Sequence, residues 1–408
     1  MKIMVLAANY PYPDFPFSGI FNERCVLTMN RLCDLVEVVV PRPYTPFFSN
    51  FSSKWQIYSK IKSYEERNGI AIHRPPMVQI PKIGASFWID IGAFICCRNY
   101  IRYLHQKNKF NIILSFDLLS SGGLAWRMGR YLNIPACGWA FGSDVKVLKK
   151  SSFGKVVNLA IKNLDLVFYQ SYELLERAAE LCNVKSKDMS SEKHKILPHG
   201  IPLPAKVLNK ENRESIRCKW GIKDDEIIVI SIGRITKEKG IYELLKSISY
   251  VCLRNEKIKC ILVGAMPAFD ESVNVKNEIQ KDLILSKHVQ VFSACNPNEI
   301  WGILSAADIF LFASHKEGMP NSLIEAMAMG VPSVAFEIPP IKELDGDTGS
   351  IKKVPPFDTT IFGNEILTLA SSPEYRKEIG EKGKQRVSEK YNIERNVAIA
   401  ITNMEKLI

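Results

Sequence analysis

The sequence lacks several features that define whole classes of proteins. No apolar run reaches the ~20 residues that a transmembrane helix needs, and the longest, residues 85–97, is interrupted by Asp90. The start, MKIMVLAANYPYP, carries one lysine and soon meets prolines, which favours a first buried strand over an export signal. The ten cysteines form no C-x-x-C pair, and most lie among apolar neighbours. We therefore expect a cytoplasmic chain with reduced core thiols.

Familiar nucleotide-binding and metal-binding signatures are missing as well. There is no Walker A loop and no G-x-G-x-x-G fingerprint, and no motif of a nucleic-acid-binding family occurs. No group of metal-ligand residues has usable spacing; His315 is a lone candidate, for which a structural role is the better explanation. We expect neither a required metal nor a nucleic-acid partner.

Positive charge is abundant only in the first half of the chain. Residues 1–200 hold 26 Lys and Arg against 15 Asp and Glu, whereas residues 201–408 hold 28 of each. This asymmetry indicates an anionic partner for the first half, such as a membrane surface, a nucleic acid or a phosphorylated substrate. A solvated basic surface that only aids solubility explains it equally well.

The alternation of apolar runs and amphipathic segments predicts the fold class. At 408 residues the chain has room for two or three domains. Short runs rich in Val and Ile alternate with helix-length segments, as in parallel sheets with crossover helices. The candidate strands are 2–8, 35–40, 70–75, 111–116, 134–141, 164–171, 195–200, 226–233, 259–264, 288–294, 308–314 and 332–337. We predict two doubly wound α/β domains, joined near the proline-rich residues 197–206.

Ligands of such sheets bind beyond the carboxyl ends of the strands, so the loops after strands are candidate sites. Residues 233–240, GRITKEKG, place Arg234 and Lys239 in a glycine-bounded turn that opens a helix. Backbone amides and two cations suit a phosphate group there, although an exposed basic turn explains this loop alone. After the first strand, Gly19 precedes a helix that begins near Phe21. One glycine before a helix is a weak phosphate signal, and an ordinary turn glycine fits as well.

A third loop carries two glutamates eight positions apart, in EGMPNSLIEAMAMGVPSV, residues 317–334. Ser322 and Glu325 have the S-x-x-E spacing of a capping box, so helix capping alone would explain Glu325. Capping does not explain Glu317, which precedes Gly318 at the carboxyl end of a predicted strand. A carboxylate there is suited to accept hydrogen bonds from sugar hydroxyls.

The E-x7-E spacing followed by EAMAMGVPSV resembles the retaining family 4 glycosyltransferases, which have the GT-B fold. The G-R-x(n)-K-G turn of that family is matched by Gly233, Arg234, Lys239 and Gly240, and its nucleotide-domain ending by KELDGDTGSI. The similarity spans nearly the whole chain. The segment PYPDFPFSGIFNERCVLTMNRL further resembles the subgroup of teichuronic acid and capsular polysaccharide synthesis enzymes.

The resemblance implies a GT-B architecture of two Rossmann-like domains facing a central cleft. Residues 1–200 would bind the acceptor, residues 201–387 would bind the nucleotide sugar, and the terminal helix 388–408 would pack back on the first domain. It implies transfer of a sugar from a UDP or GDP donor, with retention and without a metal, to a lipid-linked or oligosaccharide acceptor in cell-surface polysaccharide synthesis. The leaving phosphate itself would help to deprotonate the acceptor.

Roles carry over to matching positions. Arg234 and Lys239 would bind the donor diphosphate, Glu317 the sugar hydroxyls, Glu325 the ribose, and Gly19 would let the N-terminal loop approach the diphosphate. Catalytic roles would fall to Arg234, Lys239, Glu317 and Asp144. The remaining donor-binding positions are Gly233, Gly318, Met319, Asn321 and Ser322.

The chain departs from the family pattern at two places. In WAFGSDV, Phe141 stands where histidine is frequent, while Asp144 is retained and would position the acceptor or the domain interface. Helix capping by Ser143 or Asp144 explains that segment equally well. Pro339 and Pro340 stand where two glycines are common. Contacts to the donor sugar are expected to differ at both places.

The basic first half suits a phosphate-bearing, lipid-linked acceptor, and peripheral binding to the inner face of an anionic membrane is expected. One segment could form an amphipathic interfacial helix, although a core helix explains its apolar face at least as well. Its residues are Phe87, Trp88, Ile91, Phe94, Ile95, Arg98 and Arg102.

Two rival functions remain open from the sequence. Sugar-nucleotide epimerases share the two-domain plan but need no acceptor, which would leave the basic half without a purpose. A non-catalytic sugar-binding protein would ordinarily carry an export signal.

Overall fold

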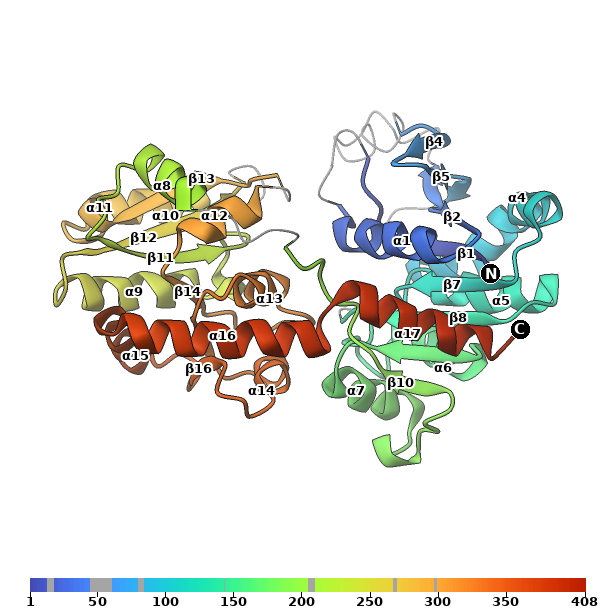
Figure 1. Ribbon diagram of the computed structural model, residues 1–408. Helices are drawn as coiled ribbons and strands as arrows, with labels where there is room; N and C mark the ends of the chain where they lie inside the picture. The colour runs from blue at the N-terminus through green and yellow to red at the C-terminus, as the bar shows by residue number, and fades with distance from the viewer. Residues whose placement is uncertain are drawn as a thin grey trace. The chain divides into compact units, whose positions relative to one another are not determined.

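A computed structural model describes residues 1–12, 18–44, 61–79, 84–142, 144–204, 210–266, 270–296 and 299–408 (Figure 1). The chain forms two compact units. The first comprises Met1–Gly200 together with Ile393–Ile408, and the second comprises Ile201–Asn392. Each unit has its own sheet and its own pair of hydrophobic cores.

The first unit is built on a mainly parallel sheet. Within the described residues this sheet has eight strands in the order β10-β9-β8-β7-β1-β2-β5-β4, and only β4 runs antiparallel to its neighbour. The strands are β1 Lys2–Ala7, β2 Leu35–Val39, β4 Tyr64–Arg67, β5 Ile70–His73, β7 Ile112–Phe116, β8 Ala136–Ala140, β9 Leu166–Tyr169 and β10 His194–Ile196. A separate parallel pair is formed by β3, Arg42–Tyr44, and β6, Pro76–Val78.

Helices cover both faces of this sheet because successive strand residues point to opposite sides. Val5 packs in one core with α1 and α17, which lie side by side (Figure 1). Met4 and Leu6 pack in the other core with α4, α5, α6 and α7. The helices are α1 Ile20–Leu32, α3 Ala85–Phe87, α4 Ala93–Asn108, α5 Gly122–Leu132, α6 Ser152–Asn163, α7 Tyr172–Cys182 and α17 Ile393–Glu405, with a π-helical turn at Trp88–Gly92 and a 3₁₀ turn at Ser186–Asp188.

The last helix of the chain packs in the first unit, but it is shorter than the expected 388–408. Residues 388–392 belong to the second unit, where Asn392 pairs with Ile201 in an isolated parallel bridge. In α17 the residues Val397, Ile401 and Met404 are buried in the core shared with α1. The helix therefore acts as an outer layer of the N-terminal sheet.

The second unit is a fully parallel, doubly wound sheet in the order β13-β12-β11-β14-β15-β16, counted over the residues that the structure describes. Its strands are β11 Ile227–Ile232, β12 Ile258–Ala265, β13 Val289–Ser293, β14 Ile309–Phe312, β15 Ser333–Phe336 and β16 Ile351–Val354. Its helices are α8 Lys210–Lys219, α9 Ile241–Cys252, α10 Ser272–Lys281, α11 Leu285–His288, α12 Ile300–Ala306, α13 Asn321–Ala328, α14 Pro339–Asp345, α15 Thr359–Ser371 and α16 Pro373–Lys390. Val229 packs with α9 and α15, whereas Ile228 and Ile230 pack with α12, α13 and α14.

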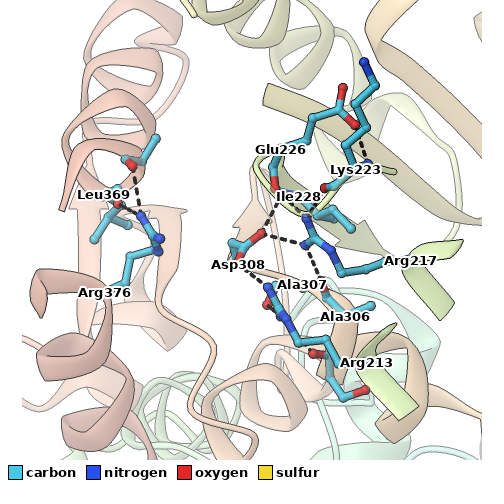
Figure 2. Close-up of polar contacts among 12 residues, drawn as sticks. Arg213, Arg217, Lys223, Glu226, Ile228, Ala306, Ala307, Asp308, Leu369 and Arg376 are labelled. Carbon is cyan, nitrogen blue, oxygen red and sulfur yellow. Dashed lines mark hydrogen bonds and ion pairs between the residues drawn. The ribbon is translucent and has the colours of Figure 1, made fainter. Parts of the chain in front are cut away.

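A buried ion-pair network ties α8 to the start of β14 (Figure 2). Asp308 accepts hydrogen bonds from Arg213 at 2.6 Å, from Arg217 at 3.1 Å and from the Ile228 amide at 2.8 Å. The Arg217 side chain is only 5% exposed and also donates to the Lys223 carbonyl oxygen at 2.9 Å. One carboxylate thus pairs with two guanidinium groups and ties α8 to the starts of the central strands β11 and β14.

Each predicted strand is present, although several are shorter than expected. The segment 195–200 keeps pairing only as far as Ile196, because Pro198 has no amide hydrogen for the ladder. The sequence did not predict β3, β4, β6 and β16.

The cysteines are free thiols, but Cys218 is exposed rather than in a core. Among the described residues, no helix is both long and apolar enough to cross a bilayer.

The strand order reverses once in each sheet. These two reversal points indicate where the candidate ligand sites lie. In the first unit, β1 lies between β2 and β7; in the second, β11 lies between β12 and β14. At such a switch point the following loops diverge to opposite faces and leave a crevice beyond the strand ends. Arg234 follows β11, while Asp117 and Ser120 follow β7.

Candidate active site

The loop after β11 carries Arg234, whose guanidinium has no ion-pair or hydrogen-bond partner within the described residues. Arg234 is exposed, and the described part of the chain supplies it with neither an ion pair nor a hydrogen bond. Lys239 closes a 3₁₀ turn, Lys237–Lys239, directly before α9. The predicted turn of residues 233–240 therefore exists and ends at a helix N-terminus.

Gly240 is required where α9 begins. It has φ +71°, and a Cβ at this position would overlap the carbonyl oxygen of Ala313. Only glycine combines this backbone conformation with such a close approach. The N-terminus of α9 can therefore pack directly against the end of β14, which brings the two predicted loops together.

Lys239 and Glu317 form an ion pair although they are 78 residues apart in sequence. The Glu317 side chain is 10% exposed and that of Lys239 is 31% exposed. Because the lysine occupies one carboxylate oxygen, the position of Glu317 is restricted.

A cavity of about 180 Å³ lies beside this pair. Gly233, Arg234 and Lys239 line it from the β11 loop, and Ser314 and Ser322 line it from the β14 loop and α13. The first residue of α9, Ile241, also lines it, so the N-termini of α9 and α13 both reach this cavity. Two cations and two helix N-termini make the cavity an anion site of the kind that binds phosphate.

The capping-box prediction for α13 is wrong. The helix begins at Asn321 after Pro320, and no side chain caps it. Ser322 is therefore its second residue, and Glu325 lies buried in the second turn, 2% exposed. The Oδ1 atom of Asn321 is buried without a hydrogen-bond partner in the described structure. Gly318 and Met319, which lead into the helix, are partly exposed.

Glu325 does not cap the start of α13 but lies near the residues that follow β13. Burial raises the pKa of the Cys295 thiol, and the charges of Glu299 and Glu325 add to the increase. The two glutamates of the motif therefore have different surroundings: Glu317 has Lys239, and Glu325 has the residues beyond β13.

Two acidic residues that the sequence did not reveal brace the Arg234 turn. Asp270 accepts hydrogen bonds from the Ile235 amide at 3.3 Å and the Met266 amide at 2.9 Å. Burial opposes ionisation of Asp270, but bonds from Ser272 and these amides lower its pKa overall. Glu271 accepts hydrogen bonds from the Lys237 amide of the turn at 3.4 Å and from the hydroxyl of Tyr242 on α9 at 2.8 Å. No motif marks either residue, because each acts on backbone atoms of a distant loop.

His315 has a structural environment. Its Nε2 lies 3.3 Å from Glu243 Oε2, and its ring lies 4.6 Å from the ring of Phe357. Across the described ranges, no group of three or more His, Cys, Asp or Glu residues could hold a metal ion.

In the first unit, Asp144 is buried in a cage of backbone amides. It accepts hydrogen bonds from Gly142 at 2.7 Å, Leu118 at 2.9 Å and Phe141 at 3.2 Å, and it is 1% exposed. It joins the loops after β7 and β8. Helix capping does not explain it, because α6 is capped by Ser151; Ser143, the other capping candidate, lies outside the described residues.

Local packing explains why glycine stands at position 19 and what the Phe141 ring contacts. Gly19 has φ +70°, and a Cβ there would come within 2.5 Å of the Asn9 carbonyl oxygen. The turn into α1 therefore demands glycine whether or not a phosphate binds. The Phe141 ring packs edge-on against His199, with centroids 5.5 Å apart.

Pro339 and Pro340 are the first two residues of α14. Neither has a backbone N–H, so this helix start cannot offer the amides that glycines at these positions would offer.

Asp117 forms a coupled acidic pair with Asp144. Burial, followed by the charge of Asp144, raises the pKa of Asp117 to about 7. Because this pKa lies above the ordinary value of 3.8, ionisation of Asp117 destabilises the folded state. Stability should therefore fall as the pH rises from about 4 to about 7.

Asp117→Asn should remove this penalty. Asparagine keeps an acceptor for the Ser120 amide and tolerates the φ of +87°. We expect the variant to be more stable than the wild type at pH 8 by on the order of 1 to 3 kcal/mol, with a gain at pH 5 less than half as large. Thermal unfolding at both pH values measures this. The exposed Asp188→Asn is the control; equal gains at the two pH values would contradict the assignment.

Comparisons with known proteins agree with the fold prediction. Residues 212–386 match the protein family described as "Glycosyl transferases group 1". The TuaC protein of Bacillus subtilis, whose name places it in teichuronic acid biosynthesis as a glycosyltransferase, is 28% identical over 85% of this chain and 83% of its own length. The capsular polysaccharide biosynthesis glycosyltransferase CapM of Staphylococcus aureus is 28% identical over 54% of this chain and 60% of its own length.

Two solved structures match the fold over the whole chain. Sucrose-phosphate synthase from Thermosynechococcus elongatus has a TM-score of 0.75 at 19% identity, covering 100% of this chain and 99% of its own. HepE of Anabaena in complex with UDP has a TM-score of 0.72 at 15% identity, covering 100% of both chains. Both support the GT-B architecture of two Rossmann-like units, which confirms the predicted fold class.

Proposed function

We propose that this chain, whose residues 212–386 form a domain of the group 1 glycosyltransferases, is a retaining glycosyltransferase of cell-surface polysaccharide synthesis. Its donor would be a UDP-linked or GDP-linked sugar. The observation that carries the proposal is the cavity beside Lys239 and Glu317, into which the unpartnered Arg234 also opens. The names of the TuaC and CapM relatives support the polysaccharide context.

The cavity suits departure of a nucleoside diphosphate. As the bond between the sugar C1 and the phosphate oxygen breaks, negative charge grows on the diphosphate. Arg234, Lys239 and the helix N-termini would stabilise that charge without reorganising, which is the most effective form of electrostatic catalysis. Because these groups already supply positive charge, we propose that the reaction needs no added metal.

Glu317 would hold the donor sugar and Glu325 the nucleotide ribose. The pairing of Glu317 with Lys239 holds its carboxylate beside the diphosphate site, where it would accept hydrogen bonds from sugar hydroxyls. Glu325 is buried near the residues after β13, at the same carboxyl edge of the sheet. Gly233, Gly318, Met319, Asn321 and Ser322 would shape the walls.

Retention follows from attack on the same face. The acceptor oxygen forms its bond to C1 on the side from which the diphosphate departs, and the acceptor proton passes to an oxygen of the leaving phosphate. No protein base is then needed. Asp144 is too deeply caged to touch a substrate, so we propose that it positions the β7 and β8 loops.

The direct test is to incubate purified protein with UDP-hexoses or GDP-hexoses and a lipid-linked or oligosaccharide acceptor in EDTA. Release of the nucleoside diphosphate and the anomeric configuration of the glycosylated acceptor are followed by NMR. Release without metal and a product anomer equal to that of the donor are expected. An inverted product would refute retention, and conversion of the donor to its epimer without sugar transfer would identify an epimerase instead.

An exposed apolar ridge in the first unit supports peripheral membrane binding. Phe87, Ile91 and Ile95 are 44%, 40% and 52% exposed and follow one another at four-residue spacing, with Arg98 and Arg102 exposed further along α4. The opposite face of this segment is buried, as a core helix requires. The buried face agrees with the core-helix interpretation, and the exposed ridge supports the proposal of an interfacial helix.

The double variant Ile91→Glu, Ile95→Glu should bind anionic vesicles at least tenfold more weakly than the wild type, because it removes apolar area and adds like charge. Co-sedimentation with phosphatidylglycerol vesicles at low salt measures this. Leu283→Glu, at an 80% exposed position in the second unit, is the matched control. Failure of the wild type to bind such vesicles would end this part of the proposal.

A further inference from the structure

The first unit has a cavity of its own, of about 230 Å³, at the point where its strand order reverses. Tyr10 lines it from the loop after β1, Arg42 from β3, Arg74 from the segment after β5, and Ser120 from the loop after β7. It lies at the carboxyl edge of a parallel sheet, where ligands of this architecture bind. The volume suffices for several water molecules or for a sugar ring with one substituent.

Within the described residues, two buried side chains at this cavity have hydrogen-bond donors without a partner. Arg74 is 2% exposed; its Nη2 donates to Glu65 at 2.7 Å and to the Pro11 carbonyl at 3.0 Å, while its Nη1 meets no acceptor in the described part of the chain. Tyr10 is also 2% exposed, and its hydroxyl has no partner among the same described residues. Burial raises the pKa of Tyr10, so its hydroxyl keeps its proton and remains a donor.

Arg42 adds a cation that no carboxylate neutralises within the described residues. Its Nη1 donates to the Ile61 carbonyl, whereas its Nε is buried without a partner. Of the lining residues that the structure describes, none is an Asp or a Glu. The cavity therefore combines two guanidinium groups and a phenol, all donors, with an excess of positive charge.

We propose that this cavity binds an anionic oxygen group, a phosphate or a carboxylate, on the sugar acceptor. The inference rests on the proposed function, since it gives the acceptor its chemical class. Arginine presents planar pairs of N–H groups that match such anions, and leaving buried donors unpaired is unfavourable. The anionic group supplies the hydrogen-bond acceptor oxygens that the donors of Arg42, Arg74 and Tyr10 lack among the described residues.

Titration calorimetry tests this with inorganic phosphate, glucose 1-phosphate and glucuronate as probes. The protein carries Arg234→Ala and Lys239→Ala, so that the donor site of the second unit does not compete for anions. Arg42→Gln in this background should weaken binding of the preferred probe about tenfold to a hundredfold, the size expected for a charged hydrogen bond. Preference for the phosphates or for glucuronate identifies the source of the anion.

Arg177→Gln is the matched control, because it removes the same charge from an exposed position on α7. It should leave binding unchanged. Arg74→Gln is a second test, judged only if its unfolding midpoint stays near that of the parent. Absence of binding by all three probes, or equal binding in Arg42→Gln and the parent, would overturn the proposal. Failure of the proposed function shows separately, as a lack of nucleotide-sugar binding by the wild type.

Discussion

Arg234→Ala should reduce sugar transfer by about 10²–10³-fold, the loss seen when one fixed donor to a developing anion is removed. The expectation follows from the isolation of this guanidinium: it opens into the cavity and has no partner among the described residues, so its charge is available to a ligand. Because the charge on the diphosphate grows as the bond breaks, kcat should fall more than the donor affinity does. Steady-state kinetics of nucleoside diphosphate release measure both.

Arg254→Ala is the matched control for this loss. Arg254 carries the same charge in the same unit, but it lies exposed over the ring of Tyr250 at the end of α9. Its removal should leave kcat within about twofold of the wild type. Equal losses in the two variants would mean that general electrostatics, rather than a fixed diphosphate contact, explain the effect.

Asp308→Ala should have the largest effect on stability, lowering the unfolding free energy of the second unit by about 3–5 kcal/mol. The carboxylate pairs with Arg213 and with the buried Arg217 and accepts a hydrogen bond from the Ile228 amide, so its removal leaves buried positive charge and a strand amide unpaired (Figure 2). Urea unfolding measures the loss. Hydrogen exchange of the β11 and β14 amides shows whether this unit opens first.

The exposed pair of Lys257 and Asp225 provides the comparison within the same unit. Their side chains are 58% and 62% exposed, so the solvent already screens this ion pair. Asp225→Ala should leave the urea midpoint nearly unchanged. Equal shifts of the urea midpoint in Asp308→Ala and Asp225→Ala would show that burial of the ion pairs around Arg217 does not determine how much they stabilise the unit.

The sequence predicted the parallel strands well because the central ones, such as β7 and β8, are apolar runs buried on both faces. It predicted that Arg234, Lys239 and Glu317 belong to one site for a different reason. Loops that follow parallel strands meet at one edge of the sheet. The strand β4 was missed because its residues, YEER, are charged and only half buried at a sheet edge. A pattern of apolar residues cannot reveal a strand that buries so little.

Features that depend on backbone geometry could not be predicted. The capping box at Ser322 failed because the chain enters α13 two residues earlier than the spacing suggests, after Pro320. The π-helical turn at Trp88–Gly92 brings the Trp88 ring against the backbone of Gly92, where a Cβ would come within 2.7 Å of that ring, and no spacing of residues indicates such a turn. The bracing of the Arg234 turn by Asp270 joins residues whose proximity only the folded sheet defines.

Thermal shift with a panel of UDP-linked and GDP-linked sugars, without added metal, tests the central claim most directly. We expect one nucleotide sugar to stabilise the wild type, the shift to be lost in Arg234→Ala, and a weaker shift to remain in Glu317→Ala. This pattern would identify the donor and place its diphosphate at Arg234. Stabilisation of the wild type by none of the sugars, or an undiminished shift in Arg234→Ala, would contradict the assignment of this cavity as the donor site.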